Sequence, residues 1–190
     1  FDALVRQGGL TAGRWALVHG GASGVGTAAI QLVRAVGASS IVTTSTAKVE
    51  RCGRLGADVV VDYTTEDFVA VSKGATAGRG VDVVLDMVGG SYLPRNVSAA
   101  AAQGRIVQIG VMGGGPAEVN LGVVIMKRLQ IIGTTLRNRP VEEKIAVCRR
   151  FATEVLPRFE RGELAPVIDR RFPLAEIAAM LATPAAWRCT

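Results

Sequence analysis

Histidine and cysteine are scarce in this chain of 190 residues. It holds one histidine, His19, and three cysteines, Cys52, Cys148 and Cys189, which lie far apart and form no C-x-x-C pair. Because a zinc site needs a cluster of such ligands, the sequence predicts no metal site. Scattered cysteines in odd number are typical of a reduced protein, so a cytoplasmic location is expected. A lone histidine at the end of a strand is interpreted as a structural residue.

Aromatic residues and long apolar runs are also few. Aromatic side chains make up 5 % of the chain. No apolar stretch approaches the roughly 20 residues that span a bilayer. The net charge of +6 is spread over pairs such as Arg149 and Arg150, with no basic tract that interleaves aromatic residues. The sequence therefore predicts no nucleic-acid partner and no membrane partner. The charge is interpreted mainly as solvated surface, with a share that attracts an anionic cofactor.

What the chain does contain is an alternation of short β-branched runs with helical stretches. Strands that are apolar almost throughout and alternate with helices predict a parallel sheet covered on both faces. The expected fold class is therefore α/β, with one doubly wound Rossmann sheet. Strands are expected at 15–19, 40–44, 58–62, 82–87, 104–109 and 129–134, and helices at 24–36, 47–55, within 65–75, at 91–102, near 121–127, at 141–161 with a kink at Pro157, and at 175–182 after an extended stretch at 167–174.

A glycine-rich segment, GGASGVG, lies between the first expected strand and the next helix. It fits G-x-G-x-x-A, with Gly24, Gly26 and Ala29. It also fits G-x-x-S-x-x-G, with Gly20, Ser23 and Gly26. In a Rossmann sheet this turn meets the pyrophosphate of a dinucleotide, and the N-terminus of the helix supplies free N–H groups and a partial positive charge. The segment therefore predicts a dinucleotide site, with a plain glycine-rich turn as the alternative.

The loop after the second expected strand indicates which dinucleotide is bound. Domains that bind NAD place Asp or Glu about 20 residues beyond the glycines, where it holds the ribose 2′-hydroxyl. Here residues 43–47 include hydroxyls and no carboxylate, and Lys48 follows. Hydroxyls and a lysine suit a 2′-phosphate, which favours NADP over NAD. The alternative is that Lys48 only belongs to a solvated helix end, although a cation there opposes the helix dipole.

The stretch VHGGASGVGTAAIQL strongly resembles the medium-chain dehydrogenase/reductase superfamily, in its zeta-crystallin-like quinone oxidoreductase branch. GAD, VDYTTEDF, GVDVVLDMVGG, GRIVQIGVMGG and GTTLRNR follow in order, so the resemblance covers about residues 1–181. It implies a nicotinamide cofactor, NADP, on this domain. It also implies a homodimer that forms through edge strands near LQIIGTTL.

The resemblance implies several groups of cofactor-binding residues. Gly21, Ser23, Gly24, Val25 and Gly26 match the pyrophosphate loop, Ser45, Thr46 and Lys48 the 2′-phosphate loop, Tyr63 the tyrosine on the adenosine phosphate side, Val88, Gly89, Ile109 and Gly110 the strand ends that flank the crevice, and Thr135, Leu136 and Arg137 the stretch near the nicotinamide. Tyr63 can also be read as a strand-end aromatic residue, and Arg137 as a surface charge. No catalytic acid, base or nucleophile is named, and Asp62, Asp82 and Asp86 are interpreted as structural.

The chain departs from the resembled family at both ends. Family members carry a GroES-like domain before the cofactor domain, and it is expected to be missing from this chain. A last strand similar to GKIVL is replaced by LATPAAWRCT. We therefore expect an NAD(P)-binding Rossmann domain over residues 1–181 and an atypical tail over 182–190, in which Trp187 and Cys189 have no function.

Three interpretations of function stay open. The leading one is the NADPH-binding domain of a zinc-independent oxidoreductase that passes hydride to a quinone or a related electron-poor acceptor. The second is the enoyl-thioester reductase of a fatty-acid or polyketide system, which shares the same loop. The third is a fragment that binds a dinucleotide without catalysis or serves only in assembly. The isolated chain is expected to lack full activity.

Overall fold

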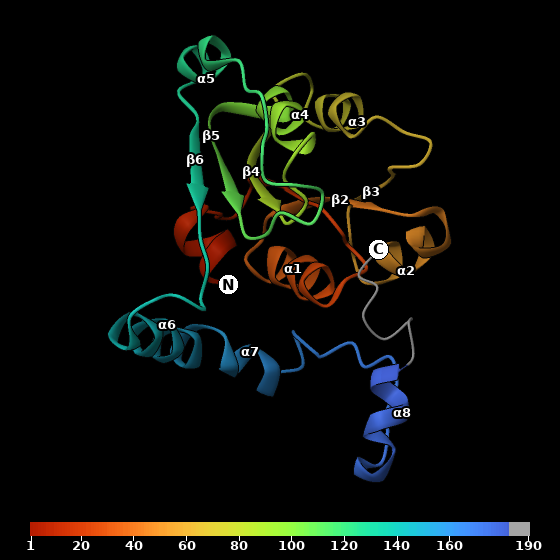
Figure 1. The fold of residues 1–190 in the computed structure, drawn as a ribbon. Helices are drawn as coiled ribbons and strands as arrows, with labels where there is room; N and C mark the ends of the chain where they lie inside the picture. The colour runs from red at the N-terminus through yellow and green to blue at the C-terminus, as the bar shows by residue number, and fades with distance from the viewer. Residues whose placement is uncertain (183–190) are drawn as a thin grey trace.

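The structure is a computed structural model, and it describes residues 1–182. Within that range, parallel strands form one sheet in the order β3-β2-β1-β4-β5-β6 (Figure 1). Because the order reverses between β1 and β4, the sheet is doubly wound, and the predicted Rossmann-type α/β fold is confirmed. The strands are β1 (Trp15–Val18), β2 (Ser39–Thr44), β3 (Val59–Asp62), β4 (Val81–Asp86), β5 (Ala100–Gln108) and β6 (Gln130–Gly133).

Helices cover both faces of this sheet because alternate residues of the strands are buried on opposite sides. Val18 of β1 packs in one core cluster with Ile30 and Val33 of the first long helix. Its neighbour Leu17 packs in the other cluster with Phe68 and Val97. The helical elements are η1 (Asp2–Gln7), α1 (Gly24–Ala35), η2 (Thr46–Lys48), α2 (Val49–Arg54), α3 (Phe68–Ala75), α4 (Tyr92–Ala99), α5 (Leu121–Lys127), α6 (Val141–Glu154), α7 (Leu156–Glu160), η3 (Leu174–Glu176) and α8 (Ile177–Ala182).

The helix predicted over 91–102 is wrong at its C-terminal end. Helix α4 stops at Ala99, and Ala100 already pairs with Val81 of β4 as a strand residue. The register then shifts before Arg105 pairs with Val83. Pairing with a buried central strand therefore overrides the helix propensity of the alanine run.

The long helix predicted over 141–161 is broken earlier than expected. The break lies at Val155, which separates α6 from α7, and not at Pro157. Pro157 lies in the first turn of α7, where the missing N–H of proline costs nothing. Residues 167–173 form no strand. Figure 1 shows α6 and α7 beneath α1, with α8 projecting away from the sheet. The predicted tail lies outside the described residues from 183 onward.

Candidate dinucleotide-binding site

The glycine-rich segment folds as a tight turn between β1 and α1. Gly20 has a left-handed φ of +67°, which a side chain would strain. Ser23 caps α1, and its Oγ accepts a hydrogen bond of 3.0 Å from the N–H of Gly26. A Cβ on Gly26 would lie 2.1 Å from the carbonyl oxygen of Gly20. Gly26 is therefore required so that the helix can pack directly on the turn.

Gly24 meets a different need, because a Cβ built on it would have no heavy atom within 4 Å. Gly24 and Val25 are the first residues of α1 and are exposed. Their N–H groups have no acceptor within the helix, since the first turn lacks the preceding carbonyls. Exposed N–H groups and the positive end of the helix dipole together favour an anion in front of this turn.

A hollow of about 270 Å³ opens beside the turn, at the carboxyl ends of the strands. We call it the switch-point hollow, because it lies where the strand order reverses, the usual ligand position in such a sheet. The residues that line it lie at or just after the carboxyl ends of β1 to β5. Its lining residues are Gly20, Ala22, Ser23, Thr43, Thr44, Ser45, Lys48, Tyr63, Met87, Val88, Tyr92, Met112 and Gly113.

A carboxylate lies next to the predicted 2′-phosphate loop. Asp62 ends β3 and pairs in register with Thr44 of β2. Its carboxylate accepts hydrogen bonds from the hydroxyls of Thr46 and Thr64, the latter at 2.6 Å. These hydroxyls hold the pKa of Asp62 below its usual value. The prediction of no carboxylate in 43–47 is correct as sequence, but the neighbouring strand supplies one and engages the Thr46 hydroxyl.

A second, larger cavity lies on the other side of the α1 N-terminus. Its volume is about 530 Å³, and we call it the α1–α7 cleft. Three predicted site residues line it, namely Gly24, Val25 and Ile109. Apolar side chains such as Phe151 and Phe159 close it from below. Eight of the sixteen predicted cofactor residues therefore line one or the other of two cavities, which both reach the start of α1.

Residues 24–153, more than half of the chain, match the family described as zinc-binding dehydrogenase. The chain belongs to this family. The medium-chain dehydrogenase/reductase resemblance, with its quinone-oxidoreductase-like cofactor-binding domain, is thereby confirmed.

Among curated relatives, this dehydrogenase-family chain is 29 % identical to human quinone oxidoreductase over 179 residues, which covers 94 % of the chain and 53 % of the relative. It is 47 % identical to tomato (Solanum lycopersicum) 2-methylene-furan-3-one reductase over 66 residues, 34 % of the chain and 17 % of the relative. The chain therefore spans about half, or less, of the curated relatives that it matches.

Solved structures agree with this assignment. The CurK enoyl reductase gives a TM-score of 0.79 at 29 % identity, covering 94 % of this chain and 53 % of that one. The Escherichia coli quinone oxidoreductase complexed with NADPH gives a TM-score of 0.76 at 27 % identity, covering 88 % of this chain and 51 % of that one.

The name of the family raises the question of zinc. Across residues 1–182, no group of three or more His, Cys, Asp or Glu side chains could hold a metal ion. His19 is buried between Thr43 and Asn96, and burial raises the pKa of the Cys52 thiol. The described residues therefore do not fit a zinc ion, and we derive no step through one. None of the described helices is long and apolar enough to cross a membrane.

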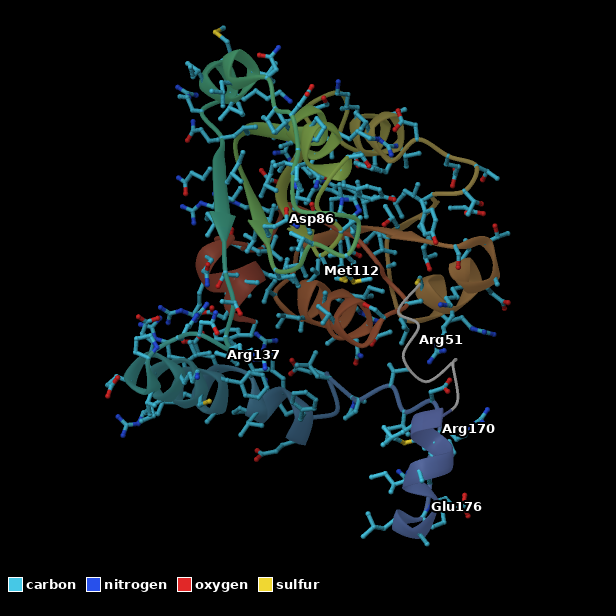
Figure 2. The ribbon with its side chains drawn as sticks, viewed as in Figure 1. Arg51, Asp86, Met112, Arg137, Arg170 and Glu176 are labelled. Carbon is cyan, nitrogen blue, oxygen red and sulfur yellow. The ribbon has the colours of Figure 1, made fainter. Side chains whose placement is uncertain are left out.

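Several predicted residues of this dehydrogenase-family chain line neither cavity. Gly21, Gly26, Thr46, Gly89, Gly110, Thr135, Leu136 and Arg137 form this group. Gly21 supports the turn, because its N–H donates to the carbonyl of Thr43 at 2.9 Å. The exposed residues 135–137 contact the start of α6, where Lys144 Nζ donates to the carbonyl of Arg137 at 3.0 Å. Figure 2 shows Arg137 beside α6, away from Asp86 and Met112.

Beyond β4 and β5 the sequence predicted Val88, which lines the switch-point hollow, but not four other lining residues. Met87 and Tyr92 follow β4, and Met112 and Gly113 follow β5. The signal was available, since carboxyl ends of parallel strands share one edge of the sheet. Tyr92 also packs edge-on against His19, with ring centroids 4.8 Å apart, so the floor of the hollow is aromatic.

Proposed function

We propose that the chain is the NADPH-binding part of an oxidoreductase that passes hydride to a quinone or a related electron-poor acceptor. The observation that carries this proposal is the switch-point hollow, which opens between the exposed N-terminus of α1 and the Lys48 side of β2. Relatives named quinone oxidoreductase support the activity, and they share about half of their length with this chain. A cofactor cradle of this kind supplies binding and orientation, while the reaction belongs to the cofactor.

The residues present fit a dinucleotide phosphate. The N–H groups of Gly24 and Val25 would hold the pyrophosphate at the start of α1. Ser45, Lys48 and Tyr63 would hold the 2′-phosphate and the adenosine side. When bound, the nicotinamide supplies the hydride. Val25 and Ile109 present apolar surface at the mouth of the α1–α7 cleft, where they would exclude water from the reacting end.

The preference for NADP over NAD is part of the proposal. Lys48 and Ser45 line the hollow, and both suit a 2′-phosphate. Asp62 is the nearest opposing feature, yet its carboxylate is engaged by two threonine hydroxyls and does not line the hollow. A phosphate there would form charge-assisted bonds that a 2′-hydroxyl cannot match.

The test is a titration of the chain with NADPH and with NADH, for the wild type and Lys48→Glu. We expect NADPH to bind the wild type at least about tenfold more tightly than NADH, and Lys48→Glu to abolish the difference. Lys73→Glu, an exposed change of equal charge in α3, is the matched control and should keep the preference. A folded wild-type chain that binds neither nucleotide contradicts the proposal and favours a fragment without catalysis.

The alternative acceptor is an enoyl thioester, and the similarity to the CurK enoyl reductase favours it. The intact protein that contains this chain should be given a quinone and a crotonyl-type thioester in turn. A higher kcat/KM for the quinone supports the leading proposal, and a higher value for the thioester supports the alternative. Added zinc and a chelator should both leave the rate unchanged if the reaction is zinc-independent, as we propose.

We also propose a homodimer formed through the edge of the sheet. Among residues 1–182, strand β6 pairs on one side only, with β5, and Ile131 on it is 43 % exposed. An exposed apolar edge strand is a template for pairing with a second copy. Sedimentation of the wild type and of Ile131→Lys should then give a dimer and a monomer.

A further inference from the structure

A chain of hydrogen bonds runs beneath the switch-point hollow. His19 is fully buried, with Nδ1 at 3.1 Å from the hydroxyl of Thr43 and Nε2 at 2.8 Å from Oδ1 of Asn96. The amide of Asn96 donates to Oδ2 of Asp86 at 2.8 Å. His19, Asn96 and Asp86 are each 0 % exposed, so none of these groups can exchange its partner for water.

The Asp86 carboxylate fixes the direction of every bond in this chain. Both oxygens of Asp86 accept hydrogen bonds, and Oδ2 accepts from the NH₂ group of Asn96, so the Asn96 oxygen faces His19. His19 Nε2 must then carry the proton, and Nδ1 accepts from the hydroxyl of Thr43. Burial lowers the pKa of His19, and so does the Arg95 charge, against the opposite effects of Asn96 and Asp86. The imidazole is therefore neutral and confined to one tautomer.

Both ends of the chain reach the walls of the hollow. At one end the N–H of Gly20 points to the Thr43 hydroxyl at 3.4 Å. At the other end Oδ1 of Asp86 accepts from the N–H groups of Val88 at 2.6 Å and Gly89 at 3.0 Å. Gly20 and Val88 both line the same hollow.

The loop after β5 is connected to the residues that follow Asp86 through a second set of hydrogen bonds. The N–H of Met112 donates to the carbonyl of Met87 at 3.1 Å, and that of Gly113 donates to the carbonyl of Val88 at 2.7 Å. Met112 and Gly113 lie on the loop after β5 and line the hollow. Figure 2 shows Asp86 in the centre of the molecule with Met112 close to it.

We propose that His19, Asn96 and Asp86 are positioning residues for the dinucleotide. They act through Gly20 on the turn before α1 and through Val88 after β4, and so fix the distance between these two parts of the lining of the hollow. This inference rests on the proposed function, since it assigns the hollow to a dinucleotide. It differs from a general contribution to the core because it predicts both a proton position and an effect on affinity.

The test is Asp86→Asn, which keeps shape and removes the charge that sets the direction. The new amide must donate toward position 96, so the Asn96 side chain should turn over and donate to Nε2 of His19. The proton of His19 should then move from Nε2 to Nδ1. His19 is the sole histidine of the 190 residues, so ¹⁵N NMR of the imidazole reads the tautomer without assignment.

Nucleotide affinity is the second readout. We expect Asp86→Asn to weaken NADPH binding by about tenfold, the scale for losing hydrogen bonds to a charged group. Asp82→Asn is the matched control at the opposite end of β4, where the carboxylate accepts from the N–H of Trp15 at 2.8 Å and pairs with Arg79. It should lower the unfolding free energy and leave both the NADPH affinity and the His19 tautomer unchanged.

Each contrary outcome has one meaning. If folded Asp86→Asn keeps the His19 tautomer of the wild type, Asp86 does not set the direction of these hydrogen bonds. Unchanged or tighter NADPH binding overturns the positioning role, and tighter binding would show that removal of a negative charge outweighs geometry. A wild type that has the Nε2–H tautomer and binds no dinucleotide refutes both the proposed function and the positioning role. It still supports the direction of the hydrogen bonds between Asp86, Asn96 and His19. If Asp86→Asn does not fold, Thr43→Val replaces it. This variant removes the hydroxyl that links His19 to the N–H of Gly20, so we expect the same loss of NADPH affinity.

Discussion

The sheet region, residues 1–133, and the distal region, residues 134–182, are built on different terms. In the sheet region, strands β1 to β5 and the inner faces of α1, α3 and α4 contribute buried residues to two core clusters. In the distal region only Val155 and Leu164 are buried among the side chains that the structure describes. The lining of the switch-point hollow is therefore held by packing and directed hydrogen bonds, whereas α6 and α7 rest on a few contacts such as the one between the rings of Phe1 and Phe151.

The division also explains where the predicted site residues lie. A parallel sheet brings the carboxyl ends of its strands to one edge, and the predicted residues that line the two cavities there are Ser45, Tyr63, Val88 and Ile109, but not Gly89 or Gly110. Residues 135–137 lie just beyond the sheet, in the distal region, and are exposed. Their role beside the nicotinamide stays a prediction.

The largest expected effect is loss of a large side chain from the sheet region. Phe68 is 0 % exposed and packs against both His19 and Tyr92. We expect Phe68→Ala to lower the free energy of unfolding by about 4 kcal/mol. Phe159→Ala in the distal region, where the ring is 37 % exposed, should cost about 1 kcal/mol. Urea unfolding measures both, and equal losses would mean that the two regions are packed alike.

Glycine positions can exclude a side chain either through lack of space or through backbone conformation. Gly26→Ala forces a Cβ onto the Gly20 carbonyl, and we expect a loss of about 3 kcal/mol. Gly24→Ala, two residues earlier in open space, should change the unfolding free energy by less than about 1 kcal/mol, with a gain in helix propensity.

In the distal region the corresponding glycine is limited by its backbone alone. Gly162 has a φ of +73° and no atom near its Cβ position, so Gly162→Ala should cost about 1 kcal/mol from left-handed strain. Thermal unfolding of the three variants gives the order. A Gly26→Ala variant as stable as Gly24→Ala would contradict the close contact between α1 and the turn.

A smaller effect is expected where the sheet region departs from full hydrogen bonding. Ser72 in α3 is buried, and its hydroxyl has no hydrogen-bond partner among the described residues. Because a buried hydroxyl without a partner costs free energy, Ser72→Ala should stabilise the chain by about 1 kcal/mol. Thr153→Ala is the distal counterpart, at an exposed hydroxyl that bonds the Arg149 carbonyl, and should stay within about 0.5 kcal/mol of the wild type. Destabilisation by Ser72→Ala would contradict an unpaired hydroxyl.

The fold could be predicted from the sequence because the alternation of apolar strands with helices and the glycine-rich turn are local signals. Apolar strands that alternate with helices can hardly form anything but a covered parallel sheet, and the turn before α1 is fixed by Gly26 and Ser23. Errors occurred where a distant partner decides the local structure. Ala100 becomes strand because Val81 lies beside it, and a helix propensity has no access to that contact.

Some residues in and around the candidate site could be predicted from local motifs, and others could not. Ser45, Lys48 and Tyr63 could be named from motifs, and they do line one hollow. Asp62 and the chain from His19 to Asp86 could not be named as neighbours of that hollow, since they depend on which strands become adjacent. His19 and Asp86, which the sequence predicts to be structural, are buried and hydrogen-bonded, but nothing in the sequence indicates that Asn96 joins them.

The smallest effect concerns acid pH, and salt separates the two regions. Asp62 and Glu163 both have a pKa below the usual value, the first through the Thr46 and Thr64 hydroxyls, the second mainly through Arg161 with help from Arg158. A lowered folded pKa contributes stability above the unfolded value, near 4, and that stability is lost as the pH falls through the folded pKa.

Asp62→Asn and Glu163→Gln should therefore each flatten, by a small amount, the fall in the free energy of unfolding between pH 5 and pH 2. The Asp62 contribution should survive 1 M salt, because its partners are neutral hydroxyls. The Glu163 contribution should vanish in the same salt, since its partners are exposed arginines that counter-ions screen. Urea unfolding of the three proteins at each pH, with and without salt, decides the point. An Asp62 contribution that salt removes would mean that a cation, and not the threonine pair, holds that carboxylate beside the 2′-phosphate loop.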